Sequence, residues 1–249
     1  MSTTLYHGEP NGPSLTVLAA VFEKQVDVAL QRIDLAAGER HTGHVPRAME
    51  TDQSIEGEGP VLVVDGIAMA DSVFLACYFD DVGPGPVLRP ADPYARWQVM
   101  SWCRYVIERV APAASYLGLQ ARPPKSVPEN IASLDLAERW RAAADGQFDT
   151  AKLADSRAKI AQAADKIEAQ LADGRHWLIG DFGIADLETY AWLAGMPALV
   201  PDAFDGKPHT AAWLARVKAR PSVARALSLA TDGTPETIWA PGPEINRWG

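Results

Sequence analysis

The sequence has little cysteine and no long apolar run. Its 249 residues include only two cysteines, Cys77 and Cys103, which cannot build a disulfide framework or a cysteine metal cluster. Such sparse usage is typical of a reducing compartment. No apolar run approaches the roughly 20 residues that span a bilayer, and the start of the chain lacks the basic segment and apolar core of a secretory signal. We therefore expect a cytoplasmic protein with no membrane partner.

Positive charge is also scarce, and the histidines are not arranged as metal ligands. The chain carries 23 Lys and Arg against 32 Asp and Glu, giving a formal net charge of −9. This balance opposes non-specific binding to nucleic acid. His41 and His44 are three residues apart, but Gly43 and Pro46 beside them predict a loop and not a helix that could present both rings. We expect no metal and no nucleic-acid partner.

The most informative segment runs from Gly59 to Phe79. Two short apolar runs flank Asp65-Gly66, which is a strong signal for a two-residue hairpin turn. Asp71 and Ser72 then precede the apolar run 73–79, which predicts a helix that begins with an acid and a hydroxyl. Such residues offer acceptors beside the exposed amides and the positive end of a helix. An extended peptide could pair with backbone here and have its charged end held.

The first 80 or so residues alternate strand and helix patterns. Thr3 to His7 reads as a strand, Ser14 opens a helix, and Val26 begins a second strand that reaches toward Leu35. Residues 36–58 have almost no apolar periodicity, so we expect an irregular loop there. The order of these patterns predicts a small α/β unit.

Proline and glycine then mark a linker, and the rest of the chain has helical periodicity. Gly83-Pro84-Gly85-Pro86 and the prolines at 90 and 93 interrupt the pattern, as a linker does. Apolar stripes follow at 99–110 and 153–171; residues 184–193 predict a short buried helix, and a later helix must end before Pro221. We predict an N-terminal domain at 1–83, a linker at 84–93 and a helical domain at 94–249 that ends in an extended tail.

At this point the chain resembles the glutathione S-transferase superfamily, in which a thioredoxin-like domain is joined to an all-helical domain. The resemblance implies that fold class here: an α/β thioredoxin-like N-terminal domain plus an all-α C-terminal domain. Four sequence features carry it: Pro60, where the family has a cis-proline; the pair Asp71-Ser72; the helix-opening motif Gly183 to Asp186; and the helix end Ala219 to Val223.

A narrower resemblance is to the bacterial glutathione-dependent β-etherases, which cleave the β-aryl ether of lignin-derived aromatic compounds. It is carried by Leu88 to Tyr94, by the Trp-rich helix that follows and by Trp140-Arg141. The resemblance implies glutathione as cosubstrate, a thiolate that attacks an aromatic substrate, and a dimer. Whether that dimer is a homodimer or a heterodimer stays open.

Ser14 is the first candidate for activating the glutathione thiol. A hydroxyl at a helix start can donate to a thiolate, and the helix end favours negative charge. The simpler interpretation is that Ser14 only caps its helix. Many bacterial relatives have Cys or Asn before this Ser; here the residue is Pro13, so Asn11 is the second catalytic candidate. Tyr6, at the end of the first strand, is a third.

Four residues are expected to bind glutathione. By resemblance, Gly59 and a cis-Pro60 would present backbone to the cysteinyl part, while Asp71 and Ser72 would hold the γ-glutamyl end. Asp71 and Ser72 also have a purely structural interpretation as helix-capping residues.

Two further expectations concern the helical domain. Asp186 is expected to cap its helix at the third position, with Gly183 as the N-cap. Tyr105 and Tyr116 are expected to line an aromatic substrate pocket, although aromatic residues at helical spacing also fit a core.

Two alternatives to the ether-cleaving enzyme stay open. One is another glutathione reaction, such as conjugation of a halogenated or epoxide substrate. The other is a non-catalytic subunit that stabilises a paralogous glutathione transferase in a heterodimer. Pro13, Gly59 and the acidic residues Glu56 and Glu58 motivate this second alternative, because each departs from the expected site.

Overall fold

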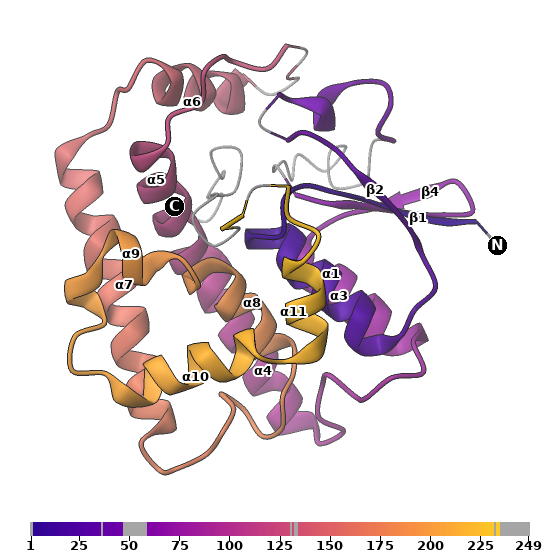
Figure 1. Ribbon diagram of the computed structural model, residues 1–249, viewed down its shortest axis with the longest axis vertical. Helices are drawn as coiled ribbons and strands as arrows, with labels where there is room; N and C mark the ends of the chain where they lie inside the picture. Colours follow the sequence, from indigo (N-terminus) through magenta and orange to yellow (C-terminus); the bar gives the residue numbers. More distant parts are fainter. Residues whose placement is uncertain are drawn as a thin grey trace.

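In the computed structural model, a small sheet with two helices adjoins a larger all-helical part (Figure 1). The structure describes residues 2–35, 37–46, 59–129, 131, 134–231 and 233–234. The predicted tail at 238–249 and most of the predicted loop at 36–58 lie outside these residues.

The N-terminal part has the predicted order of strands and helices. Its elements are β1 (Thr3–His7), α1 (Gly12–Lys24), β2 (Ala29–Arg32), a short 3-10 turn (Glu39–His41), β3 (Val61–Val64), β4 (Ile67–Met69) and α3 (Ser72–Val82). The strands form one sheet in the order β2-β1-β3-β4, with β1 parallel to β2 and antiparallel to β3. The second strand is shorter than the sequence predicts, and all its residues are exposed.

The predicted hairpin is confirmed. β3 and β4 pair antiparallel, and Asp65 and Gly66 connect them with φ angles of 47° and 86°. Two successive positive φ angles are typical of the turn that Asp-Gly favours, because aspartate tolerates the left-handed region and glycine has no Cβ to oppose it.

One face of the sheet packs on α1 and α3, which lie side by side in Figure 1. The buried side chains between these layers are apolar, and they belong to the same core cluster as the helical part: Leu5, Leu18, Leu62, Leu75 and Phe79. A continuous core across both parts fixes their relative position.

Beyond α3, the described part of the chain is helical, as predicted. Its elements are α4 (Pro93–Tyr105), a π-helical turn (Val106–Val110), α5 (Ala111–Ala121), α6 (Leu134–Ala144), α7 (Thr150–Leu171), α8 (Ile184–Leu193), α9 (Met196–Leu199), a 3-10 turn (Pro201–Ala203), α10 (Pro208–Lys218) and α11 (Pro221–Leu227). The break before Pro221 and the buried helix at 184–193 are confirmed. The domain boundaries at 83 and 94 stay a prediction.

Helix α8 occupies the centre of the molecule. All ten of its residues are buried, and it contacts α1 and α3 on one side and α4 and α10 on the other. The C-terminal helix α11 returns to pack on α1 (Figure 1). Arg220 and Ser222 there both donate hydrogen bonds to Glu23 of α1. The two parts are thus joined near the N-terminal helices that hold the candidate site.

Candidate functional site

Helix α1 begins two residues before Ser14. Its N-cap is Asn11, and Gly12 follows with a φ of 48°, in the left-handed region that favours glycine. Pro13 fits the first turn because its missing N–H has no helical acceptor there. The interpretation of Ser14 as a plain N-cap is therefore wrong. The helix starts earlier because Gly12 permits the sharp turn into it.

The Ser14 side chain points back to the loop before α1. Its hydroxyl oxygen accepts a hydrogen bond from the backbone N–H of Gly8 at 3.0 Å, and the residue is buried. This bond uses a lone pair and leaves the hydroxyl hydrogen able to donate. Asn11 lies on the same loop and is also buried. Its side chain makes no capping bond to α1.

The residues before β3 lie beside this helix start. A Cβ added to Gly59 would lie 3.6 Å from Cβ of Pro13, so Gly59 and the first turn of α1 are neighbours. The predicted cis bond into Pro60 is wrong, since the described residues contain no cis peptide bond. The trans form of an X-Pro bond is favoured by about 0.5–1 kcal/mol.

Asp71 caps α3, as its structural interpretation predicts. Its carboxylate accepts a hydrogen bond from the N–H of Phe74 at 3.0 Å. Its backbone has a φ of 75° and a ψ of 122°, which is strained for a residue other than glycine, and such strain concentrates at functional sites. Burial raises the pKa of Asp71, while the bonds from the backbone of Phe74 and Val73 oppose that rise.

Ser72 makes a contact that joins the two parts of the protein. It is buried, and its hydroxyl donates to Oε1 of Glu188 on α8 at 3.2 Å. The same carboxyl accepts from the hydroxyl of Thr16 at 2.8 Å and from the indole N–H of Trp192 at 2.9 Å. The N-terminal turns of α1 and α3 therefore meet at one carboxyl group.

Sequence reasoning missed Glu188. The signal was present, because an acidic residue within a helix expected to be buried must find partners. Burial raises its pKa to about 7, although the three hydrogen bonds favour the ionised form. Its neighbour Asp186 was recognised: the predicted capping box with Gly183 is confirmed, and burial raises the pKa of Asp186 to about 6.

The two candidate pocket tyrosines have different surroundings. The hydroxyl of Tyr105 is buried and has no hydrogen-bond partner within the described part of the chain. Tyr105 directly precedes the π-helical turn Val106–Val110, and such turns are frequent at functional sites. Tyr116 instead accepts a hydrogen bond from the N–H of Asp149 at 2.8 Å and packs edge to face on Phe148.

The loop that carries Asn11 is held by the C-terminal chain. Glu9 on this loop pairs with Arg32 at the end of β2 and accepts a hydrogen bond from the backbone N–H of Thr231 at 3.0 Å. The chain after α11 therefore lies against the entrance to α1. This contact could not be predicted, because the two residues are far apart in the sequence.

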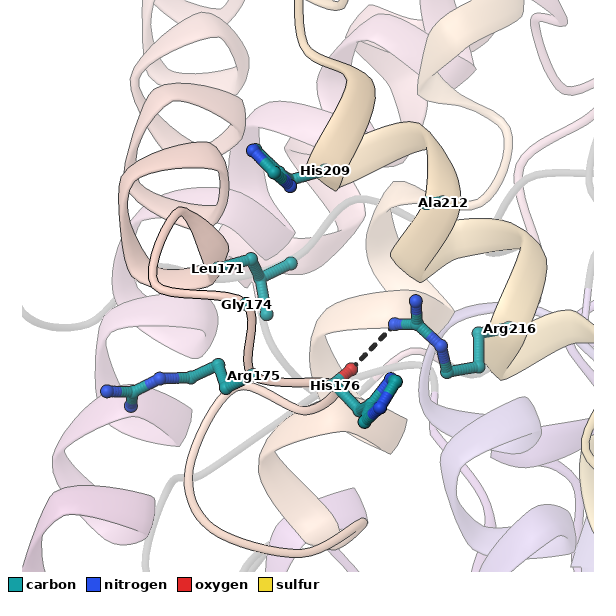
Figure 2. Close-up of a pocket in the computed structure, with 7 residues that line it drawn as sticks. All are labelled: Leu171, Gly174, Arg175, His176, His209, Ala212 and Arg216. Atoms are coloured by element: carbon teal, nitrogen blue, oxygen red, sulfur yellow. Dashed lines mark hydrogen bonds between the residues drawn. The ribbon is translucent and has the colours of Figure 1, made fainter.

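A cavity of about 100 Å³ lies elsewhere, between the end of α7 and helix α10 (Figure 2). Among its lining residues, Arg216 donates to the backbone oxygen of His176 at 2.7 Å, and the side chain of Arg175 points away from the others. None of the candidate site residues lines it. Among the described residues no group of His, Cys, Asp and Glu is arranged to hold a metal ion.

Comparisons with known proteins agree with this architecture. Residues 123–221 match the family model "Glutathione S-transferase, C-terminal domain". The chain is 26% identical to Protein LigF of Sphingobium sp. over 90% of its own length and 92% of that protein, and 25% identical to a glutathione S-transferase of Silene vulgaris over 91% and 98%. The resemblance to the glutathione S-transferase superfamily is therefore confirmed.

Solved structures show the same fold. The crystal structure of beta-etherase LigF from Sphingobium sp. superposes with a TM-score of 0.81 at 24% identity, covering 92% of this chain and all of that one. A glutathione S-transferase from Methylobacillus flagellatus, crystallised with glutathione bound, gives a TM-score of 0.67 at 21% identity over 90% and 98%. The predicted fold class, a thioredoxin-like part followed by a helical domain, is confirmed.

Proposed function

We propose that this protein binds glutathione and uses the thiolate to cleave a β-aryl ether of an aromatic substrate. The observation that carries the proposal is the convergence of two helix starts. The first turn of α1, with Ser14, and the N-terminus of α3, with Asp71 and Ser72, meet through Thr16 and Glu188. Similarity to LigF, which is described as a beta-etherase, supports the choice of reaction.

The tripeptide would lie between these two helix starts. Its thiolate would receive the hydrogen of the Ser14 hydroxyl, whose oxygen already accepts from Gly8. Both this bond and the positive end of α1 favour a negative sulfur. Asn11 remains the second candidate donor. At the other end, the Asp71 carboxylate would attract the α-amino group, and Ser72 would face the α-carboxylate.

The reaction itself is a displacement at carbon. The thiolate attacks the carbon that bears the ether oxygen, a C–S bond forms, and the C–O bond breaks with its electron pair leaving on the phenolate. An adjacent carbonyl stabilises the charge that develops at the attacked carbon. The protein would lower the thiol pKa, hold the two reactants in line and exclude water. Glutathione is consumed as a cosubstrate in this scheme.

Tyr105 is the pocket residue with the stronger support. Its hydroxyl is buried without a partner in the described part of the chain, so a phenolic or methoxy oxygen of a substrate could complete its hydrogen bonding. The Tyr116 hydroxyl already accepts from Asp149, which favours a structural contribution beside any contact with substrate.

A dimer is part of the proposal. Phe74 on α3 and the stacked pair Tyr94 and Trp97 on α4 are each at least 60% exposed. Large aromatic side chains in water are typical of protein interfaces. A heterodimer and a homodimer are both consistent with these side chains.

One specific observation favours the second candidate function, a non-catalytic partner for a paralogous chain. The trans bond into Pro60 directs the Gly59 backbone differently from the cis form that the resemblance implies. A subunit that has lost catalytic activity would tolerate the altered direction of the Gly59 backbone.

A turnover assay separates the candidates. The purified protein is incubated with glutathione and a ketone that bears a β-aryl ether, and the released phenol and the glutathione thioether are quantified. Release by this chain alone supports the proposal. Conjugation of a halogenated substrate without ether cleavage would favour the other glutathione chemistry. Activity that appears only after a paralogous transferase is added would favour the partner role.

A further inference from the structure

The buried carboxyl of Glu188 lies at the boundary between the two parts of the protein. It is 0% exposed. Hydrogen bonds reach it from three helices: Thr16 on α1 donates to Oε2, while Ser72 on α3 and Trp192 on α8 donate to Oε1. A carboxyl with three donors and no access to water is satisfied in its ionised form, but the loss of hydration opposes that form.

The charges around Glu188 also oppose its ionisation. Within the described part of the chain, the ionisable groups that interact with it are Asp71 at the start of α3 and Cys103 on α4, while α1 faces it with the hydroxyl of Thr16. Both are acidic or neutral, and the ion pairs found among the described residues do not include Glu188. Burial is the main cause that raises the pKa of this carboxyl to about 7, and the charge of Asp71 adds to it.

The geometry determines which oxygen takes the proton. The indole N–H of Trp192 can only donate, so Oε1 must remain an acceptor in both states. The proton therefore sits on Oε2, where the hydroxyl of Thr16 can rotate to accept it. Protonation leaves Oε1 as a neutral carbonyl oxygen, and a bond to a neutral acceptor is roughly half as strong as one to a charged acceptor.

Protonation of Glu188 therefore weakens the hydrogen bond that the hydroxyl of Ser72 donates to Oε1. We propose that Glu188 is a positioning residue: when ionised it holds the hydrogen of Ser72, and when protonated it releases that hydrogen to a carboxylate bound at the N-terminus of α3. The inference rests on the proposed function, in which that carboxylate belongs to the γ-glutamyl end of glutathione. The ligand class is an α-amino acid group whose carboxylate faces Ser72 and whose ammonium faces Asp71.

Binding should weaken as the pH rises. Ionised Glu188 withdraws the hydrogen bond of Ser72 from the ligand carboxylate, and it places a negative charge behind the same hydroxyl. Loss of one hydrogen bond to a charged group corresponds to about a tenfold weaker affinity. The other contacts of the ligand do not depend on this hydrogen bond, so binding should weaken and not disappear.

The test uses S-methylglutathione, which has no thiol to titrate. Its Kd is measured by calorimetry between about pH 5.5 and about pH 8.5 with the full chain. The wild type should bind about tenfold more weakly at the upper pH. Glu188→Gln can place its amide oxygen against Trp192 and its NH₂ against Thr16, so it mimics the protonated form. That variant should keep the low-pH Kd across the range.

A second variant tests the mechanism without removing the carboxyl. Thr16→Val deletes a donor that favours ionised Glu188, so the midpoint of the Kd change should move to higher pH. Thr189→Val removes a buried hydroxyl from α8, the helix that carries Glu188. That hydroxyl donates to the backbone oxygen of Ala185 and accepts from the indole N–H of Trp102. This control should leave the midpoint in place, because it removes a buried hydroxyl without removing a hydrogen bond to Glu188.

The outcomes separate this inference from the proposed function. Binding that is equally strong at every pH, or an identical pH profile in wild type and Glu188→Gln, overturns the role of Glu188 and leaves glutathione binding intact. Absence of binding at every pH overturns both. An unmoved midpoint in Thr16→Val also contradicts the inference, even if Glu188→Gln fails to fold.

Discussion

The ammonium group of Lys24, at the end of α1, lies 3.2 Å from the carboxylate of Asp80 on α3, and the two side chains are 2% and 6% exposed. Lys24 also donates to the backbone oxygens of Gly85 and Pro86. Asp80 in turn accepts from the N–H of Leu88 at 2.8 Å. The ion pair and these backbone bonds therefore link residues 85–88, which lead into the helical part, to both α1 and α3.

Replacing Lys24 by methionine should destabilise the protein by about 2 kcal/mol, because two carbonyl oxygens lose their charged donor and Asp80 loses one of its two cations. Asp80 keeps its ion pair with Arg89 and its bond from the N–H of Leu88. Urea unfolding measures the change. Lys159→Met is the matched control: its partner Asp155 is one turn away on α7 and more than half exposed, so the loss should stay below about 1 kcal/mol. Equal losses in the two variants would contradict a special role for the buried pair.

Glu188 should make the unfolding free energy depend on pH. Its pKa in the folded protein is raised from 4.5 to about 7, so the folded state binds this proton more tightly than the unfolded state. The stabilisation is complete below about pH 4.5 and is lost as the pH rises to about 7, which amounts to about 3 kcal/mol. Glu188→Gln should lose this part of the pH dependence in urea unfolding. Parallel curves for the two proteins would show that Glu188 does not titrate in this range.

Tyr105→Phe should leave stability almost unchanged, because the deleted hydroxyl has no partner within the described residues. If that hydroxyl contacts substrate, KM for an aryl ether should rise several-fold while the Kd for S-methylglutathione stays constant. Tyr116→Phe is the comparison: it removes the acceptor of the Asp149 N–H and should cost about 1 kcal/mol of stability. An unchanged KM in Tyr105→Phe would remove this residue from the substrate pocket.

Gly183→Ala should destabilise the junction between the two parts by about 2 kcal/mol or more. A Cβ at this position would lie 2.4 Å from the carbonyl oxygen of Leu88, which accepts from the N–H of Ile184 at 3.1 Å. Relief of that clash requires backbone to move. Gly43→Ala is the control, because a Cβ there meets nothing within 4 Å and its φ is not positive. Thermal unfolding of the two variants should differ clearly, and similar midpoints would contradict the packing described.

Much of the fold could be predicted because local signals agreed with the final structure. Asp65-Gly66 specified the hairpin, Asp71 specified the start of α3, and Pro221 separated α10 from α11. The start of α1 was misplaced because Gly12 takes a positive φ that the sequence pattern does not reveal. The trans bond into Pro60 also departed from expectation, since isomer choice depends on surroundings and not on the dipeptide.

The candidate site was predictable only in part. Ser14, Ser72 and Asp71 were singled out from their places at helix starts, and the structure brings those starts together. Glu188 was missed because its importance comes from Thr16 and Ser72, which are 172 and 116 residues away in the sequence. Contacts of that range depend on how α8 packs against α1 and α3, and no local pattern encodes that packing. The catalytic and binding roles themselves stay predictions.

The most direct test of the account is the pKa of the glutathione thiol when bound to this protein. It is measured from the ultraviolet absorbance of the thiolate as the pH is raised, in wild type, in Ser14→Ala and in Ser156→Ala, a buried serine on α7. The account predicts a thiol pKa below about 7.5 in wild type and in Ser156→Ala, and a rise of at least about one unit in Ser14→Ala. A bound thiol that titrates near its free value of about 8.5 in all three proteins would contradict it.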